Sequence, residues 1–304
     1  MNQKLILILI CIFIITCLNN KNIGQINSNP FDNILSRSKN LSATQKIFKP
    51  ERLQNISPGQ YTKADWAEII DATWGPGLPT DEKLAIFDNA WNLIDAGYGA
   101  FMNMYINLDS LRNVFRPEIA GGVSRGRFAA ILNYLGLALM DQHTYIIDGV
   151  VNEGTYPTPG TPLLVFGAAI SIDYFGAGLT PLPNSTLLVY KVTPNHVLGL
   201  QPGDIVLGYD GVPWKQLYKQ LLDAQLPCIL INWGSSEQSR KHAILQSAGL
   251  NWHLFDTIDI QKYDTKEIVH LPTSLLQNQQ GEIYGNEQLP VAGVDFPDIY
   301  HEIM

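Results

Sequence analysis

LGLQPGDIVLGYDGVPW, residues 198–214, is the stretch of this chain whose turn residues decide the fold around it. Gly203 tolerates the backbone angles of a tight turn, and the Asp204 carboxylate beside it can accept backbone N–H groups across that turn. The apolar run that follows predicts a strand. Asp210 and Gly211 then favour the two positive φ angles of a type I′ hairpin. We therefore predict a turn, a strand and a tight hairpin in this order.

The flanking segments also predict strands and short helices. Residues 185–194 alternate apolar and polar side chains, and 163–172 form a near-continuous apolar run. Both patterns are typical of strands. A short helix is expected directly after the hairpin, with Trp214 on its buried face. Ser235 predicts the cap of a second helix that ends near Gly249, because Gln238 stands three residues after it. Two further strands are predicted within 251–260 and 266–272.

Upstream of this β-rich region the pattern is helical. Residues 64–74 favour a helix, and the breaker GPGLP follows them. Thr80 is predicted to cap the next helix, whose apolar stripe is Leu84, Phe87, Trp91 and Ile94. A third helix is expected to start near Arg125. The fold class predicted for the chain is α+β, with a mainly helical unit followed by an antiparallel barrel or sandwich that carries short helices.

These textures divide the chain into five segments. We predict a signal peptide over 1–24, a linker over 25–61, a helical domain over 62–150, a β-rich domain over 160–275 and a C-terminal segment over 276–304. With 304 residues and 46% hydrophobic content, the chain is long enough for two domains with ordinary cores.

The N-terminal segment predicts export. About a dozen apolar residues follow Lys4, which is typical of a signal peptide and short of the roughly 20 residues that span a membrane. An uncleaved anchor is the alternative. Cleavage is expected either after Gly24 or before Cys17, which would then be a lipidation site. The protein is therefore predicted to be periplasmic or in the cell envelope, and to meet the membrane only through its signal or a lipid anchor.

Charge and cysteine content exclude several classes of function. The formal net charge is −8 and Lys and Arg do not cluster, which argues against a nucleic-acid partner. Cys11 and Cys17 fall in the signal, so Cys228 has no partner for an intrachain disulfide and is expected to be a buried small side chain. No pattern for a metal site or a cofactor is found in the sequence.

The segment from 186 to 214 resembles the PDZ domain of bacterial exported proteases. Residues in register with the PDZ signature are Gly199, Leu200, Gly203, Asp204, Ile205, Asp210 and Gly211. We expect Gly203, Asp204, Asp210 and Gly211 to hold the turns rather than to touch a ligand. The resemblance implies a PDZ-like domain over 160–275 that binds the C-terminus of a peptide or protein.

Ligands bind PDZ domains by adding a strand to a sheet edge, with the terminal carboxylate held by N–H groups of a glycine-rich loop. The loop expected to do this lies one strand upstream of the signature. Its residues are Phe175, Gly176, Ala177, Gly178 and Leu179. A plain hairpin turn is the alternative interpretation of the same segment.

The order of a helical unit, the segment LMDQHTYIID and a PDZ-like domain resembles the N-terminal half of C-terminal-processing and tricorn-like serine peptidases. The segment 285–298 is similar to the bridge that precedes their catalytic fold. The resemblance implies that His143 is a general base for a serine, oriented by an acid such as Asp141. Alternatively, His143 interacts with the last carbonyls of a helix.

The serine of that family lies beyond the bridge, in a domain that is not on this chain. We therefore expect the chain not to hydrolyse peptides by itself. The first hypothesis is an exported binding module for peptide C-termini. The second is a truncated or split serine peptidase whose catalytic domain is supplied by another chain. The third is a structural docking module of the envelope.

Overall fold

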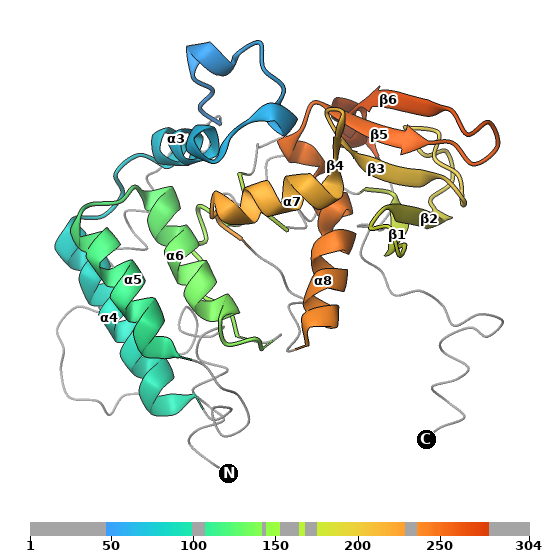
Figure 1. The fold of residues 1–304 in the computed structure, drawn as a ribbon. Helices are drawn as coiled ribbons and strands as arrows, with labels where there is room; N and C mark the ends of the chain where they lie inside the picture. Colours follow the sequence, from blue (N-terminus) through green and yellow to red (C-terminus); the bar gives the residue numbers. More distant parts are fainter. Residues whose placement is uncertain are drawn as a thin grey trace, which may run out of the picture. The chain divides into compact units, whose positions relative to one another are not determined.

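The computed structural model describes residues 47–98, 107–141, 144–152, 164–167, 175–228 and 236–279 (Figure 1). The predicted α+β class is confirmed, with helices in the N-terminal part and an antiparallel sheet with short helices after them. The chain forms two compact units. The helical unit contains 47–54 and the described parts of Thr62–Ala168 and Leu221–Arg240. The sheet unit contains Asn55–Tyr61 and the described parts of Ala169–Gln220 and Lys241–Met304.

In the described residues, the helical unit contains the α-helices α3 Lys63–Trp74, α4 Thr80–Gly97, α5 Leu108–Ala120 and α6 Arg125–Leu137. One core joins α4, α5 and α6 around fully buried side chains that include Phe87, Ile119 and Ile131. The apolar stripe predicted for α4 faces this core. Helix α5 was not predicted, because Pro117 lies inside it and its surface is largely polar.

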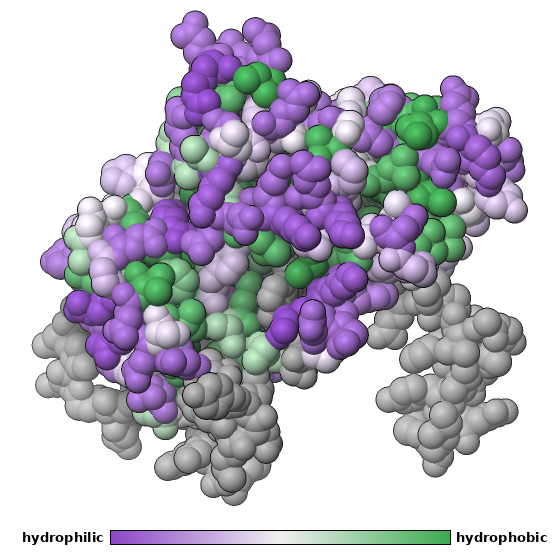
Figure 2. Space-filling model, viewed as in Figure 1, coloured by the Kyte–Doolittle hydropathy of each residue, from purple (hydrophilic) through white to green (hydrophobic). Residues whose placement is uncertain are grey.

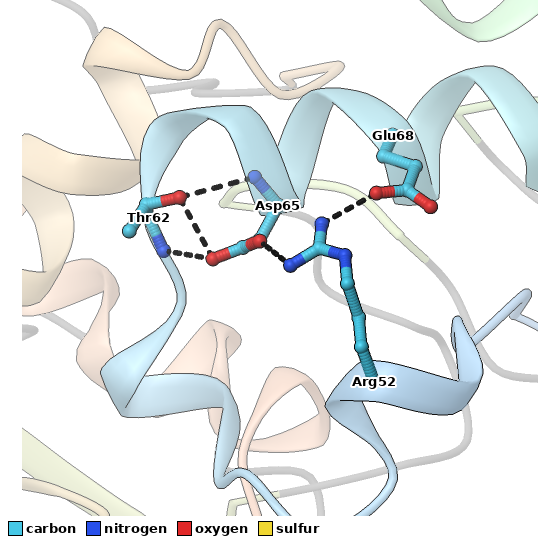
Figure 3. Close-up of polar contacts among 4 residues, drawn as sticks. All are labelled: Arg52, Thr62, Asp65 and Glu68. Atoms are coloured by element: carbon cyan, nitrogen blue, oxygen red, sulfur yellow. Dashed lines mark hydrogen bonds and ion pairs between the residues drawn. The ribbon is translucent and has the colours of Figure 1, made fainter.

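Helix α3 begins at a capping box (Figure 3). The Thr62 N–H and hydroxyl each donate to the Asp65 carboxylate at 2.7 Å, and the Asp65 N–H donates back to the Thr62 hydroxyl at 3.3 Å. Arg52, from the 3₁₀ turn η1 Glu51–Leu53, pairs with both Asp65 and Glu68. The chain before α3 is therefore tied to the first turn of that helix.

The turn between α3 and α4 differs from the prediction. Thr80 is the first residue of α4, and Pro79 precedes it without a side-chain cap, because proline has no side-chain acceptor. The buried ammonium of Lys83 donates to the carbonyls of Pro76 and Val123, each at 2.5 Å. Burial lowers the pKa of Lys83, and the two carbonyls replace its lost hydration.

The sheet unit is antiparallel throughout. Its strands are β1 Ala177–Pro181, β2 Leu187–Val192, β3 Ile205–Tyr209, β4 Val212–Pro213, β5 Thr257–Gln261 and β6 Ile268–Pro272. They follow the order β1-β2-β3-β5-β6, and β4 pairs with β3. Helices α7 Trp214–Asp223 and α8 Glu237–Gln246 stand between β4 and β5 in the chain. The 3₁₀ turns are η2 Pro58–Gln60, η4 Ser247–Leu250, η5 Trp252–Leu254 and η6 Thr273–Asn278.

The turns predicted from residues 198–214 are confirmed. Asp210 and Gly211 have φ angles of 53° and 76°, as the hairpin between β3 and β4 requires. The buried Asp204 carboxylate accepts the N–H groups of Gln201 and Tyr263, each at 2.9 Å, and pairs with the ammonium of Lys262. These residues hold the backbone, as expected.

Asp210 also connects three segments of the sheet unit. Its carboxylate accepts the N–H groups of Gly59 at 2.9 Å, Asp256 at 3.0 Å and Thr257 at 2.7 Å. Burial raises the pKa of Asp210, whereas the donors at Thr257 and Gly59 act in the opposite direction. Part of the segment predicted as a linker, Asn55–Tyr61, thus packs in the sheet unit through this carboxylate.

Three aromatic side chains form the centre of the sheet unit. Tyr209 stacks on Phe255 with ring centroids 4.9 Å apart, and Trp214 meets Tyr209 edge-on at 5.9 Å. Both polar atoms find acceptors, because the Tyr209 hydroxyl donates to the Ala248 carbonyl at 2.6 Å and the Trp214 indole N–H to that of Ile244 at 3.2 Å. The segment from α8 to η4 is thereby held against the core.

Helix α8 differs in detail from the prediction. Ser236 accepts an N–H of the first turn, at 3.0 Å from the nitrogen of Ser239. Ser235 lies outside the described residues. Gly249 lies inside η4 rather than in a left-handed stop, because a 3₁₀ turn continues the chain after α8. Strand β6 falls within the predicted 266–272. Strand β5 starts inside the predicted 251–260 but ends one residue later, at Gln261, and the 3₁₀ turn η5 occupies the first part of that segment.

Asp65→Ala is expected to lower the free energy of unfolding of the helical unit by about 1 kcal/mol at pH 7, because the capping box loses its acceptor. Although burial opposes the shift, hydrogen bonds from Thr62 and Arg52 hold the pKa of Asp65 below its ordinary value of 3.8. The stabilisation is therefore complete above pH 3.8 and disappears as the pH falls through the folded-state pKa.

Denaturant unfolding at several pH values checks this prediction. Glu68→Ala is the matched control, since Glu68 contacts the same arginine but takes no part in the capping box. A loss for Asp65→Ala that is no larger than that of Glu68→Ala, or that persists in full at the lowest pH, would contradict the role assigned to Asp65.

Candidate functional site

Only Phe175 and Gly176 of the predicted binding loop precede β1, whereas Ala177, Gly178 and Leu179 are the first three residues of that strand. Strand β1 is an edge strand of the sheet. All five residues of the predicted loop are buried, and the side chains of Phe175, Ala177 and Leu179 have no exposed surface. Gly176 has a φ angle of 77°, so the loop turns sharply just before the strand begins. The loop and β1 thus belong to the packed body of the sheet unit.

The register of β1 determines which of its backbone groups face the outer edge. Thr193 donates its N–H to the Gly176 carbonyl at 2.8 Å, and Ala177 stands opposite Val192. In an antiparallel ladder this makes Ala177 and Val192 a pair without mutual hydrogen bonds. The N–H and C=O of Ala177 therefore point away from β2, toward the edge where a further strand would add.

Two side chains hold the start of the loop. The Nδ1 atom of His196 accepts the N–H of Leu198 at 3.1 Å, so its Nε2 carries the proton and donates to the Phe175 carbonyl at 2.8 Å. Burial lowers the pKa of His196, which keeps the ring neutral near pH 7. Gln279 packs on Gly176 and donates to the Thr193 hydroxyl at 2.8 Å.

A third side chain meets the other end of the loop. Gln246, the last residue of α8, donates its Nε2–H to the Leu179 carbonyl at 3.0 Å, and it is only 7% exposed. The buried turn η4 follows directly and contacts β1. The outer edge of β1 is therefore covered by the chain's own segment from α8 to η4.

Both glycines of the loop lie close against other side chains. A Cβ at Gly178 would lie 2.7 Å from the ring of Tyr190, and a Cβ at Gly176 would lie 2.5 Å from the carboxamide of Gln279. Side chains from β2 and from the end of η6 thus occupy the space above the loop. The sequence had no periodic signal for Gln246, Gln279 or His196, because each acts through a contact distant in the chain.

Strand β6 forms the opposite edge of the sheet and is far more open. Ile268 is 50% exposed, and Figure 2 shows apolar side chains on the surface over the β5 and β6 part of the sheet. His270 is exposed and its Nδ1 lies 2.5 Å from the buried Asp259 carboxylate, which also accepts the Gly211 N–H at 2.8 Å. The sheet unit thus has one covered edge and one exposed edge.

The remaining predicted site residues give less information. His143 and Cys17 lie outside the described residues. Asp141 accepts the Thr144 hydroxyl at 2.6 Å. Burial, and next the charge of Asp141, raise the pKa of Tyr98 to about 12.

Cys228 is buried, and burial raises the pKa of its thiol. This environment is that of a packing residue rather than of a reactive thiol, because the thiolate is the reactive form.

Within the described ranges, no group of three or more His, Cys, Asp or Glu side chains is arranged to hold a metal ion. Nor does any helix in those ranges have the length and apolar character needed to cross a membrane. Compared with protein-family models, with curated proteins and with solved structures, the chain matches none of them.

Gly178→Ala is expected to destabilise the sheet unit by about 1–3 kcal/mol, since the added methyl group meets the ring of Tyr190. Tyr190→Ala removes that ring, so the double variant should lose less stability than the sum of the two single variants. Thermal unfolding of the four proteins measures the difference. Strict additivity would show that the ring does not restrict position 178.

Proposed function

We propose that the sheet unit is a PDZ-like module that binds an extended peptide C-terminus by strand addition at β1. The single observation that carries the proposal is the outward-facing backbone of Ala177, placed directly after the glycine-rich turn at Gly176. A ligand strand would pair with this backbone, and its carboxylate would accept N–H groups of the loop formed by residues 175–179.

The surroundings favour an apolar ligand terminus. Phe175 and Leu179 stand at the two ends of the predicted loop, and both apolar side chains are fully buried. A carboxylate held by backbone N–H groups needs no lysine or arginine, because the N–H dipoles supply the positive potential. Binding of so small a contact is expected in the micromolar range, roughly −8 kcal/mol.

The wider biological role follows from the resemblance to processing peptidases. In this proposal the chain is exported to the cell envelope, where it recognises C-termini of peptides or proteins. Export is supported by the apolar N-terminal segment that follows Lys4.

Two forms of one peptide test carboxylate recognition. A fluorescent peptide ending in Val or Leu with a free carboxylate should bind the purified chain with micromolar affinity in an anisotropy titration. The amidated form should bind at least about tenfold more weakly, because it loses charge-assisted hydrogen bonds. Equal affinities for the two forms would contradict binding of the terminal carboxylate at this loop.

A pair of proline variants tests the strand. Ala177→Pro removes an N–H that faces away from β2, so the ladder bonds to β2 remain while a ligand strand loses a donor. Ile268→Pro is the matched control, because its N–H faces outward from β6 by the same register argument.

We expect Ala177→Pro to weaken peptide binding about tenfold and Ile268→Pro to leave it unchanged. Circular dichroism and thermal unfolding verify that both variants fold. The reverse pattern, with binding lost only in Ile268→Pro, would place the ligand at β6 and overturn the proposal.

A further inference from the structure

The contact between Gln246 and Leu179 places a side-chain amide where the amide of a ligand strand would lie. Strand addition uses the backbone groups of alternate residues on the free edge, and the Leu179 carbonyl faces that edge. It is already occupied by the Gln246 Nε2–H at 3.0 Å. A carboxamide N–H is chemically the same donor as a peptide N–H, so Gln246 occupies the acceptor as a ligand would.

The cover extends beyond one hydrogen bond. Ser247 donates its hydroxyl to the Ile244 carbonyl at 2.6 Å, and Asn251 donates to the Ser247 carbonyl at 2.6 Å. These bonds join the last turn of α8 to η4, and both Ser247 and Asn251 are buried. The segment 244–251 is therefore one bonded piece of chain lying along β1.

We propose that Gln246 makes an autoinhibitory contact, and that the segment 244–251 must withdraw from β1 before a peptide can add there. This inference rests on the proposed function, because it concerns the regulation of the same edge. The ligand competes with an intramolecular group for the Leu179 carbonyl. The apparent affinity for the peptide is therefore the intrinsic affinity multiplied by the fraction of molecules in which the edge is open.

The closed and open forms of the edge differ in which hydrogen bonds they contain. When the edge opens, the Gln246 amide returns to water and the Leu179 carbonyl accepts a ligand N–H. The Ile244 and Ala248 carbonyls also give up the Trp214 and Tyr209 donors, which favours the closed form in the absence of ligand. In Gln246→Ala, the closed form instead leaves a buried carbonyl without this donor, which disfavours closure. The open form is then more populated, and an edge-binding peptide should gain affinity.

Gln246→Ala is thus expected to bind the free-carboxylate peptide about fivefold more tightly than the unmodified chain, the ratio that one ordinary hydrogen bond supplies. The matched control is Gln261→Ala. Gln261 also donates its Nε2–H to a backbone carbonyl, that of Lys266 at 3.4 Å, but this bond is exposed and lies on β5. Its loss should leave peptide affinity unchanged.

Hydrogen exchange gives a second measurement that needs no variant. Saturating peptide should speed exchange of the backbone amides of 244–251 in the unmodified chain, because the segment has withdrawn, and should slow exchange in β1. Slower exchange in both segments would mean that peptide binds without opening, and would overturn the autoinhibitory contact.

The outcomes separate the two proposals. If the unmodified chain binds peptide and Gln246→Ala binds equally or more weakly, the autoinhibitory contact is wrong and peptide binding stands. If neither protein binds, the proposed function itself is wrong. If only Gln246→Ala binds, both proposals are supported. An equal gain in Gln261→Ala would show that the effect is not specific to β1, and would also overturn the contact.

Discussion

The partly buried carboxylate of Asp210 is the interaction on which the sheet unit depends. It stands at the end of β3 in a left-handed conformation, and it collects N–H donors from the segment before α3 and from the start of β5. A hydrogen bond to a charged acceptor contributes about 1.5–3 kcal/mol. Three such donors bind this one side chain, and they come from segments about 150 and 45 residues away from Asp210 in the chain. These hydrogen bonds hold the start of β5 beside the end of β3.

The position of β3 determines what the two edges of the sheet are. In the strand order, β3 lies between β2 and β5. Strand β1 lies beyond β2 and strand β6 lies beyond β5, so these two strands form the edges of the sheet. Exposed edges invite unwanted strand pairing, and proteins commonly cover them. Here the segment from α8 to η4 covers β1, whereas Pro272 and the charged residues before β6 mark the open edge. Under the proposed function, a covered edge of this kind would make peptide binding depend on opening of the segment that covers it.

Local signals predicted most of the elements, and distant contacts explain what was missed. The Asp210-Gly211 hairpin, β2 and the stripe of α4 follow from turn chemistry and periodicity, which act within a few residues. Helix α5 was hidden by Pro117. The contact between Gly59 and Asp210 spans 151 residues, and Gln246 reaches Leu179 across 67. No local pattern encodes such contacts, so the cover on β1 could not be predicted.

The most direct test of the central claim, that β1 is the ligand edge, is a backbone amide NMR titration with a free-carboxylate peptide. The account predicts that chemical-shift changes concentrate in residues 175–181 and in 244–251, with β6 unchanged. Changes confined to Ile268–Pro272, with β1 and the end of α8 unaffected, would contradict it.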